Sequence, residues 1–269
     1  MSSHVLTVGA VAYDPKVVTI WEMIRDWYRE RGQALDYVLY GSYEQQVEAL
    51  LQHHVDIAWN TNVAWLRVQK RCEGRARALA MRDSDLAFLS VLVAKPGLPI
   101  AAPADLRGRT VALGSADSGQ AAILPVHWLH EAGLVENRDY KTRRFDRDVG
   151  KHGDTGASEL DVLAAIVLGH ADAGFVGDAT WARLLAEGRI DSTRVKSVWT
   201  SPGYHHCNFS VLPDFPAERE QAFLGPLFAM KYDDQRARAI MDLEGLKAWV
   251  PPSTAGYASL EAAMRQQGL

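Results

Sequence analysis

The sequence lacks several features that mark particular classes of protein. Cysteine occurs only at Cys72 and Cys207 among 269 residues, which excludes a disulfide framework and a four-cysteine metal site. No apolar run reaches the roughly 18 residues that a membrane-spanning helix needs. The 29 basic residues are outnumbered by 33 acidic ones, for a net charge of −4. The chain therefore has no basic excess of the kind that binds phosphate backbones, and no nucleic-acid partner is expected.

The composition that remains is that of an ordinary globular protein. Hydrophobic residues make up 48% of the chain and charged residues 23%, which excludes an intrinsically disordered protein. A chain of 269 residues is longer than the usual single domain of about 100–150 residues. We therefore expect one large lobe or two medium lobes.

The N-terminal residues carry no visible export signal. Met1 is followed after three residues by the apolar run Val5–Val11, without a basic region or a small-residue cleavage site. The sequence as it stands predicts a cytoplasmic protein. A periplasmic location would follow if a signal peptide had been removed.

Strand-like and helix-like patterns alternate along the chain. Residues 17–31 have apolar side chains at helical spacing, and Leu35–Tyr40 alternates as a strand does. Further short apolar strands are predicted at residues 55–59, 88–94, 110–114, 171–176, 195–200 and 209–212. This alternation indicates an α/β fold with largely parallel sheets.

Polar residues gather where the predicted strands end. In open α/β sheets, ligands bind at the loops beyond the carboxyl ends of the strands. Each residue could also serve only as a turn or a helix cap, but several in equivalent positions favour a shared site. The candidates of this kind are Tyr13, Asn60, Thr61, Ser115, Asp117, Ser118 and Asp178. The irregular, glycine-rich and charged segment 143–159 adds His152 and Glu159 as candidate ligand-binding residues.

Four ordered segments resemble the phosphonate-binding branch of the periplasmic solute-binding proteins. They are Tyr43–Leu50 followed by Val55–Trp59, Asp105–Ala112, Ser158–Leu168 with Ala171–Val176, and Trp199–Pro202. The resemblance implies the type-two fold of that family, with two α/β lobes joined by two crossing strands and a small ligand held between them. It implies residues 1–87 and 208–269 for lobe 1 and residues 88–207 for lobe 2, with the crossings near residues 88–94 and 195–208.

In that family a serine- and threonine-rich loop that opens a helix holds the phosphonate oxygens. Such a loop suits an anion, because a helix N-terminus carries unpaired N–H donors and a positive dipole end. The corresponding loop here is Ser115–Gln120, in which Ser115 and Ser118 keep hydroxyl donors. Asp117 departs from the pattern: it would repel a dianion, or it caps the helix that starts near Gln120.

A second departure is the cluster of histidine and cysteine in Gly203–Asn208. In extended backbone His205 and Cys207 would share one face, with His206 on the other. Together with His152 they form a candidate metal set, His152, His205 and Cys207, suited to zinc or iron. The same three residues are the candidates for a catalytic role, and His206 is a candidate ligand-binding residue.

Two functions of different classes follow. The first is a solute-binding protein that captures a small polar, anionic ligand with a phosphonate- or carboxylate-like group, and that would have a membrane permease as partner if a leader had been removed. The alternative is a cytoplasmic enzyme on the same scaffold, as in chorismate dehydratases and thiamine pyrimidine synthases, with the His/Cys cluster supporting metal-dependent lyase or oxygenase chemistry. A cytoplasmic sensor is a third interpretation, for which no partner-binding tail is visible in the sequence.

Overall fold

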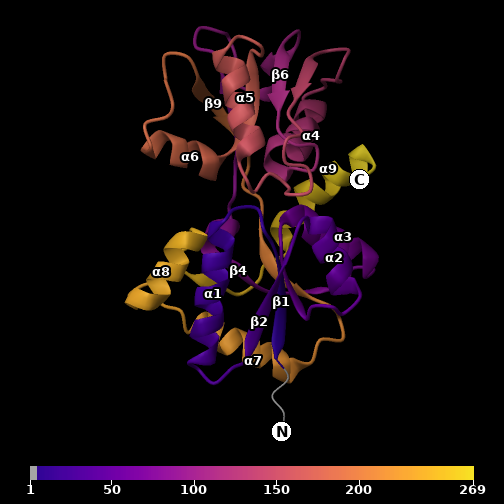
Figure 1. The fold of residues 1–269 in the computed structure, drawn as a ribbon. Helices are drawn as coiled ribbons and strands as arrows, with labels where there is room; N and C mark the ends of the chain where they lie inside the picture. Colours follow the sequence, from indigo (N-terminus) through magenta and orange to yellow (C-terminus); the bar gives the residue numbers. More distant parts are fainter. Residues whose placement is uncertain (1–4) are drawn as a thin grey trace. The chain divides into compact units, whose positions relative to one another are not determined.

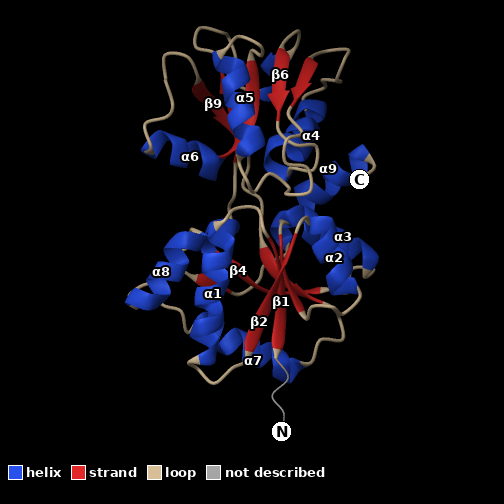
Figure 2. Ribbon diagram, viewed as in Figure 1, coloured by secondary structure: helices blue, strands red, loops and turns tan. Residues whose placement is uncertain are grey.

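The computed structural model describes residues 5–269, which form two compact units (Figure 1). Unit 1 contains the chain up to Ala87 and the segment His205–Tyr257. Unit 2 contains Phe88–Tyr204 and Ala258–Leu269. Each unit has one β-sheet with helices packed against it (Figure 2).

The sheet of unit 1 has six strands in the order β11-β4-β10-β3-β1-β2. These strands are β1 (Leu6–Val11), β2 (Leu35–Tyr40), β3 (Ile57–Asn60), β4 (Arg77–Arg82), β10 (Asn208–Val211) and β11 (Trp249–Val250). β1 pairs in parallel with β2 and β3. β10 is antiparallel to both of its neighbours, β3 and β4, so the sheet is mixed.

Helices cover both faces of this sheet. They are α1 (Lys16–Arg29), α2 (Tyr43–Leu51), α3 (Asn62–Arg71), α7 (Ala217–Phe228) and α8 (Gln235–Glu244). α1, α7 and α8 pack on one face, where Trp21, Trp27 and Phe209 form the centre of a buried apolar cluster. α2 and α3 pack on the other face, around Trp65 and Tyr257. The helical spacing of large apolar residues in α1 is what directs one side of that helix into the core.

The sheet of unit 2 has five strands in the order β7-β6-β8-β5-β9. They are β5 (Ser90–Ala94), β6 (Thr110–Leu113), β7 (Lys141–Arg144), β8 (Ala173–Gly177) and β9 (Lys196–Thr200). β6 is parallel to β7 and β8, whereas β5 is antiparallel to β8 and β9. The helices of this unit are α4 (Leu124–Glu131), α5 (Ala157–Val167), α6 (Asp178–Ala186) and α9 (Ala258–Gln267).

One helix of unit 2 begins with a π-helical turn, η3 (Gly119–Ile123), that continues directly into α4. Pro125 stands at the start of α4 and has no N–H to give to a carbonyl one turn earlier. The carbonyl of Ala121 instead accepts a hydrogen bond from the N–H of Gly114, at 2.9 Å. This bond ties the end of β6 to the first turn of the helical segment.

The structure confirms the expected α/β class and corrects two details. The sheets are mixed rather than largely parallel, because β5 and β10, the first strands after the chain passes from one unit to the other, run antiparallel to their neighbours. Residues 258–269 and 205–207 also lie in the opposite units from the expected lobes. Among the described residues, none of the helices is long and apolar enough to cross a membrane.

Candidate functional site

In unit 2, polar side chains surround the start of η3. Ser118 is the N-cap residue, and its Oγ accepts a hydrogen bond from the N–H of Ala121 at 3.2 Å. Ser115 donates its hydroxyl to Asp148. The first N–H of η3 that is hydrogen-bonded to Ser118 is that of Ala121. The N–H groups of Gly119 and Gln120 precede it and, as at any helix start, can donate to a ligand. Asp117 therefore does not cap this helix; Ser118 does.

The segment between β7 and α5 folds back onto this helix start. Gly150 donates its N–H to Oδ2 of Asp117, and Nε2 of His152 lies 4.0 Å from the same oxygen. A Cβ on Gly153 would lie 2.5 Å from Oγ of Ser118, so only glycine permits this close approach. The contact brings His152 and Asp117, far apart in sequence, to the same place.

Glu159, in the first turn of α5, is the most deeply buried carboxylate here, with 1% of its surface exposed. Its two oxygens accept hydrogen bonds from the N–H of Gly177 at 3.0 Å and from Nε2 of Gln120 at 3.2 Å. Burial raises the pKa of Glu159, and hydrogen bonds from Thr180, Gly177 and Gln120 offset only part of that effect. Glu159 is thus an acceptor that also binds a proton more readily than a solvated glutamate.

Three buried polar atoms near η3 have no hydrogen-bond partner within the part of the chain that the structure describes. They are Oγ of Ser158, Oε1 of Gln120 and Oδ1 of Asp117. A buried polar group without a hydrogen-bond partner is unfavourable by about 1–3 kcal/mol. Each of these atoms would therefore be stabilised by a hydrogen bond to a ligand or a water molecule. We name Ser115, Asp117, Ser118, Gln120, Ser158 and Glu159 the polar cluster of unit 2.

Asp178 lies at the first position of α6, directly after β8. Its N–H donates to the carbonyl of Leu89, and its Oδ1 accepts the N–H of Ala179. Nearby, the hydroxyls of Ser90 and Tyr204 are hydrogen-bonded at 2.9 Å, and Ser90 also donates to the carbonyl of Gln120 at 2.7 Å. The hydrogen bond from Ser90 therefore fixes the start of η3 to β5.

The candidates in unit 1 have partners within that unit, as caps, buried hydrogen bonds or apolar contacts. Thr61 caps α3, because its Oγ1 accepts the N–H of Ala64 at 3.2 Å. Asn60 is fully buried and bonds to Gln46 and Ser210 through its side-chain amide. Tyr13, which is partly buried, packs against the apolar cluster under α1.

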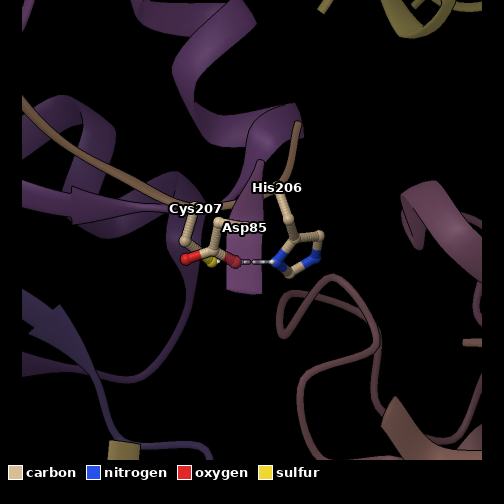
Figure 3. Close-up of side chains that lie close together, drawn as sticks. All are labelled: Asp85, His206 and Cys207. Atoms are coloured by element: carbon tan, nitrogen blue, oxygen red, sulfur yellow. Dashed lines mark hydrogen bonds and ion pairs between the residues drawn. The ribbon is translucent and has the colours of Figure 1, made fainter. Parts of the chain in front are cut away.

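The histidine and cysteine residues before β10 are arranged differently from the expectation. Sγ of Cys207 lies 3.0 Å from Nδ1 of His206, the adjacent residue, because β10 starts only at Asn208 and strand alternation does not apply earlier. The ring of His205 instead packs edge-on against Tyr257, with Nδ1 2.9 Å from the carbonyl of Ser253. His152 belongs to unit 2. Among the described residues of unit 1, the group with metal-ligand spacing is Asp85, His206 and Cys207 (Figure 3), rather than a set containing His205.

The guanidinium of Arg82, whose side chain is 15% exposed, sets the charge around Asp85. Nε and Nη2 of Arg82 bond both oxygens of Asp85, at 2.6 and 2.9 Å, and Nη1 lies 3.3 Å from the carboxylate of Glu244. Burial raises the pKa of Asp85, but Arg82 and His206 outweigh it and bring the pKa to about 2. Asp85 is therefore a carboxylate at neutral pH.

Sequence reasoning missed several of these residues. Asp85 ends the 3-10 helix Asp83–Asp85 that follows β4, and because no strand was predicted at residues 77–82, the rule that found Asn60 and Asp178 could not be applied to it. Gln120 lies inside the loop that was singled out, and Asp148 inside the irregular segment. Ser158 gave no signal, because one serine at a helix start is more often a cap.

Solved structures with this fold cover nearly the whole chain. PhnD1 from Prochlorococcus marinus, solved with methylphosphonate, has a TM-score of 0.76 and 18% identity, with 98% of each chain covered. XAC2383 from Xanthomonas citri, solved with ATP, has a TM-score of 0.76 and 19% identity over 98% of each chain. The periplasmic aliphatic sulphonate binding protein SsuA from Escherichia coli has a TM-score of 0.63 and 15% identity, with 100% of this chain and 89% of SsuA covered. At these identities the likeness establishes the two-lobed periplasmic binding protein fold.

A family model described as the periplasmic phosphonate substrate-binding protein of an ABC transporter matches residues 10–257. The match favours the solute-binding interpretation over the enzyme alternative. It does not support the expected cytoplasmic location, because members of this family are periplasmic. With most of its length matched, the chain belongs to the phosphonate-binding family of ABC-transporter substrate-binding proteins.

Proposed function

We propose that this protein is the periplasmic receptor of an ABC importer and that it binds its ligand at the polar cluster of unit 2. The observation that carries the proposal is the set of three buried, unpartnered polar atoms, on Ser158, Gln120 and Asp117, around one helix start. Hydroxyl and N–H donors at a helix N-terminus suit an acidic head group. A membrane permease that receives the ligand is the partner that family membership supports.

The carboxylates of the cluster narrow the class of ligand. Two like charges 4 Å apart repel by about 4 kcal/mol at an effective dielectric constant near 20, so Asp117 and Glu159 oppose a bare dianion. The same carboxylates are good partners for an ammonium group. We therefore propose a small ligand that combines an acidic group, of the phosphonate or carboxylate type, with a hydrogen-bond donor such as an amine.

Calorimetric titration tests this proposal with three probes: methylphosphonate, inorganic phosphate and an aminoalkylphosphonate. We expect the aminoalkylphosphonate to bind most tightly. Glu159→Gln should reduce its advantage over methylphosphonate, because the amide cannot neutralise an ammonium. If phosphate binds best, the cluster is a plain anion site and the proposed ligand class is wrong.

A matched pair of variants tests the location. Ser158→Ala removes a buried hydroxyl that has no partner in the described chain, and affinity should fall about tenfold through loss of one hydrogen bond to the ligand. Thr142→Val removes another such hydroxyl, in β7, where Thr142 pairs with Val111 two residues before the carboxyl end of the strand. Equal affinities of the two variants would place the ligand elsewhere.

A further inference from the structure

We propose that Asp85, His206 and Cys207 bind a single Zn²⁺ ion in unit 1, a site that is independent of the function proposed above. Asp85 ends the short 3-10 helix after β4, and His206 and Cys207 immediately precede β10. The N–H of His206 donates to the carbonyl of Asp85 at 3.0 Å, so the backbone itself joins the two segments. In Figure 3 the carboxylate, the imidazole and the thiol lie close together, and a dashed line joins Asp85 to the imidazole.

The distances suit a zinc ion. Zinc bonds of 2.0–2.3 Å in a tetrahedron separate neighbouring ligand atoms by about 3.3–3.7 Å. Nδ1 of His206 lies 3.5 Å from Oδ1 of Asp85 and 3.0 Å from Sγ of Cys207. One ligand atom from each residue lies within 4.8 Å of the other two. The two distances from His206 lie within about half an ångström of this range, so small rotations of the side chains would bring the three ligand atoms around one ion.

The ligand types select the metal. A sulfur, an imidazole nitrogen and a carboxylate oxygen form a mixed set that borderline Zn²⁺ accepts, whereas Mg²⁺ and Ca²⁺ prefer oxygen alone. All three residues are buried, with Asp85 at 0% exposure. Three protein ligands are one fewer than a closed structural site has, so the fourth position remains for water.

Arg82 is the orienting group of this site. Its fork fixes the Asp85 carboxylate with two hydrogen bonds, and a carboxylate oxygen has two lone pairs, so Oδ1 can accept both Arg82 and a metal. Outer hydrogen bonds to a ligating carboxylate are a regular feature of metal sites. The positive charge of Arg82 is balanced by Glu244, which is also buried. Asp85 and the Cys207 thiolate would then balance a divalent ion.

The test uses the full-length protein, purified without a histidine tag and titrated with Co²⁺ as a spectroscopic substitute for Zn²⁺. We expect about one ion per chain, visible-region bands of tetrahedral cobalt and a near-ultraviolet sulfur-to-cobalt charge-transfer band. Excess Zn²⁺ should abolish these bands. Cobalt bound without the charge-transfer band, or no cobalt bound at all, would overturn the proposal.

The two cysteines provide the control. Cys207→Ala should abolish the charge-transfer band, whereas Cys72→Ala, at the C-cap of α3 and outside the group, should retain it. A band lost in the Cys72 variant alone overturns the proposal. X-ray absorption of the zinc-loaded natural protein needs no variant: one sulfur neighbour at about 2.3 Å supports the site, and its absence refutes it.

Discussion

Glu159 shows how much a single side chain can depend on its surroundings. It is a charged residue type with 1% exposure, in a unit where no cation bonds to it among the described residues. Its partners are neutral donors, which hold the carboxylate in place but do not cancel the effect of burial on its pKa. The residue is therefore best placed for a ligand that brings its own positive charge.

The raised pKa of Glu159 makes stability depend on pH. The folded chain holds the carboxyl proton of Glu159 more tightly than the unfolded chain does. The contribution of Glu159 to the free energy of unfolding is therefore fully present below the pKa of the unfolded chain, and it is lost as pH rises through the pKa of the folded chain. The free energy of unfolding of the natural protein, minus that of Glu159→Gln, should fall as pH rises. Urea unfolding between about pH 4 and pH 8 measures this difference.

The control for this experiment is Glu261→Gln, which removes a carboxylate from an exposed position on α9. It corrects for the change in net charge. A difference between the natural protein and Glu159→Gln that rises with pH would contradict the assignment.

Some side-chain roles follow from the sequence and others do not. Thr61 was placed at a helix start by its residue type and caps α3, whereas the cap expected in unit 2 was Asp117 and the residue that caps is Ser118. The pairing of Cys207 with His206 could not be predicted, because strand alternation fails outside the regular strand. Ser158 and Gln120 acquire their importance only from what surrounds them in the fold.

The element that shapes the candidate site is the loop before α5, packed against the first turn of η3. Gly153 lies at φ +87° directly against Ser118 and Gln120, so its backbone closes over the helix start. Neither the loop nor η3 has a periodic sequence pattern. Their mutual packing is a tertiary feature that single-sequence patterns cannot predict.

Gly153→Ala should damage both stability and ligand binding. Its Cβ would lie 2.6 Å from Nε2 of Gln120 as well as against Ser118, which forces the loop away from the helix start. Gly133→Ala is the matched control, at φ +75° with nothing within 4 Å of the added Cβ. Backbone strain should lower the free energy of unfolding of both variants by about 1–2 kcal/mol. Gly153→Ala should be destabilised further by its steric clash and should bind the ligand about tenfold more weakly.

Calorimetry and urea unfolding of the two variants provide the comparison. Equal losses of stability, with ligand affinity unchanged in both, would show that the Gly153 contact does not shape the site.

Periodicity predicted most helices and strands but not strand direction. The apolar spacing of α1 and the alternation of β2 were sufficient to place those elements. The antiparallel course of β5 and β10 depends on where the chain passes between units, and no local pattern encodes that.

At the scale of the whole molecule, the last helix belongs to unit 2 although the segment before it belongs to unit 1. Leu260, Ala263 and Met264 of α9 are buried, and Nε2 of Gln267 donates to the carbonyl of Ile123 at 2.9 Å. The family resemblance predicted two lobes but assigned this helix to lobe 1. The sequence could not correct that assignment, because helical spacing does not show which core a helix joins.

Removing residues 258–269 should destabilise unit 2 selectively. Exposing a buried leucine or methionine is unfavourable by about 1.5–3 kcal/mol, so the total loss is several kcal/mol. Hydrogen exchange should show lower protection in η3 and α4, with β1 and β3 of unit 1 unchanged. The exposed Arg265→Ala is the control. Full protection of α4 after truncation would contradict the assignment of α9 to unit 2.

The strand order in unit 1 determines when each strand can pair during synthesis on the ribosome. β4 lies between β10 and β11, so it has no strand partner until residues 208–211 have been made, and its other edge stays unpaired until residues 249–250. All five strands of unit 2 precede residue 201 and can pair first. The nascent chain therefore carries an incomplete sheet of β1, β2 and β3 while the second unit assembles its own. A chaperone that shields unpaired strand edges would therefore have to cover β4 for the longest stretch of synthesis.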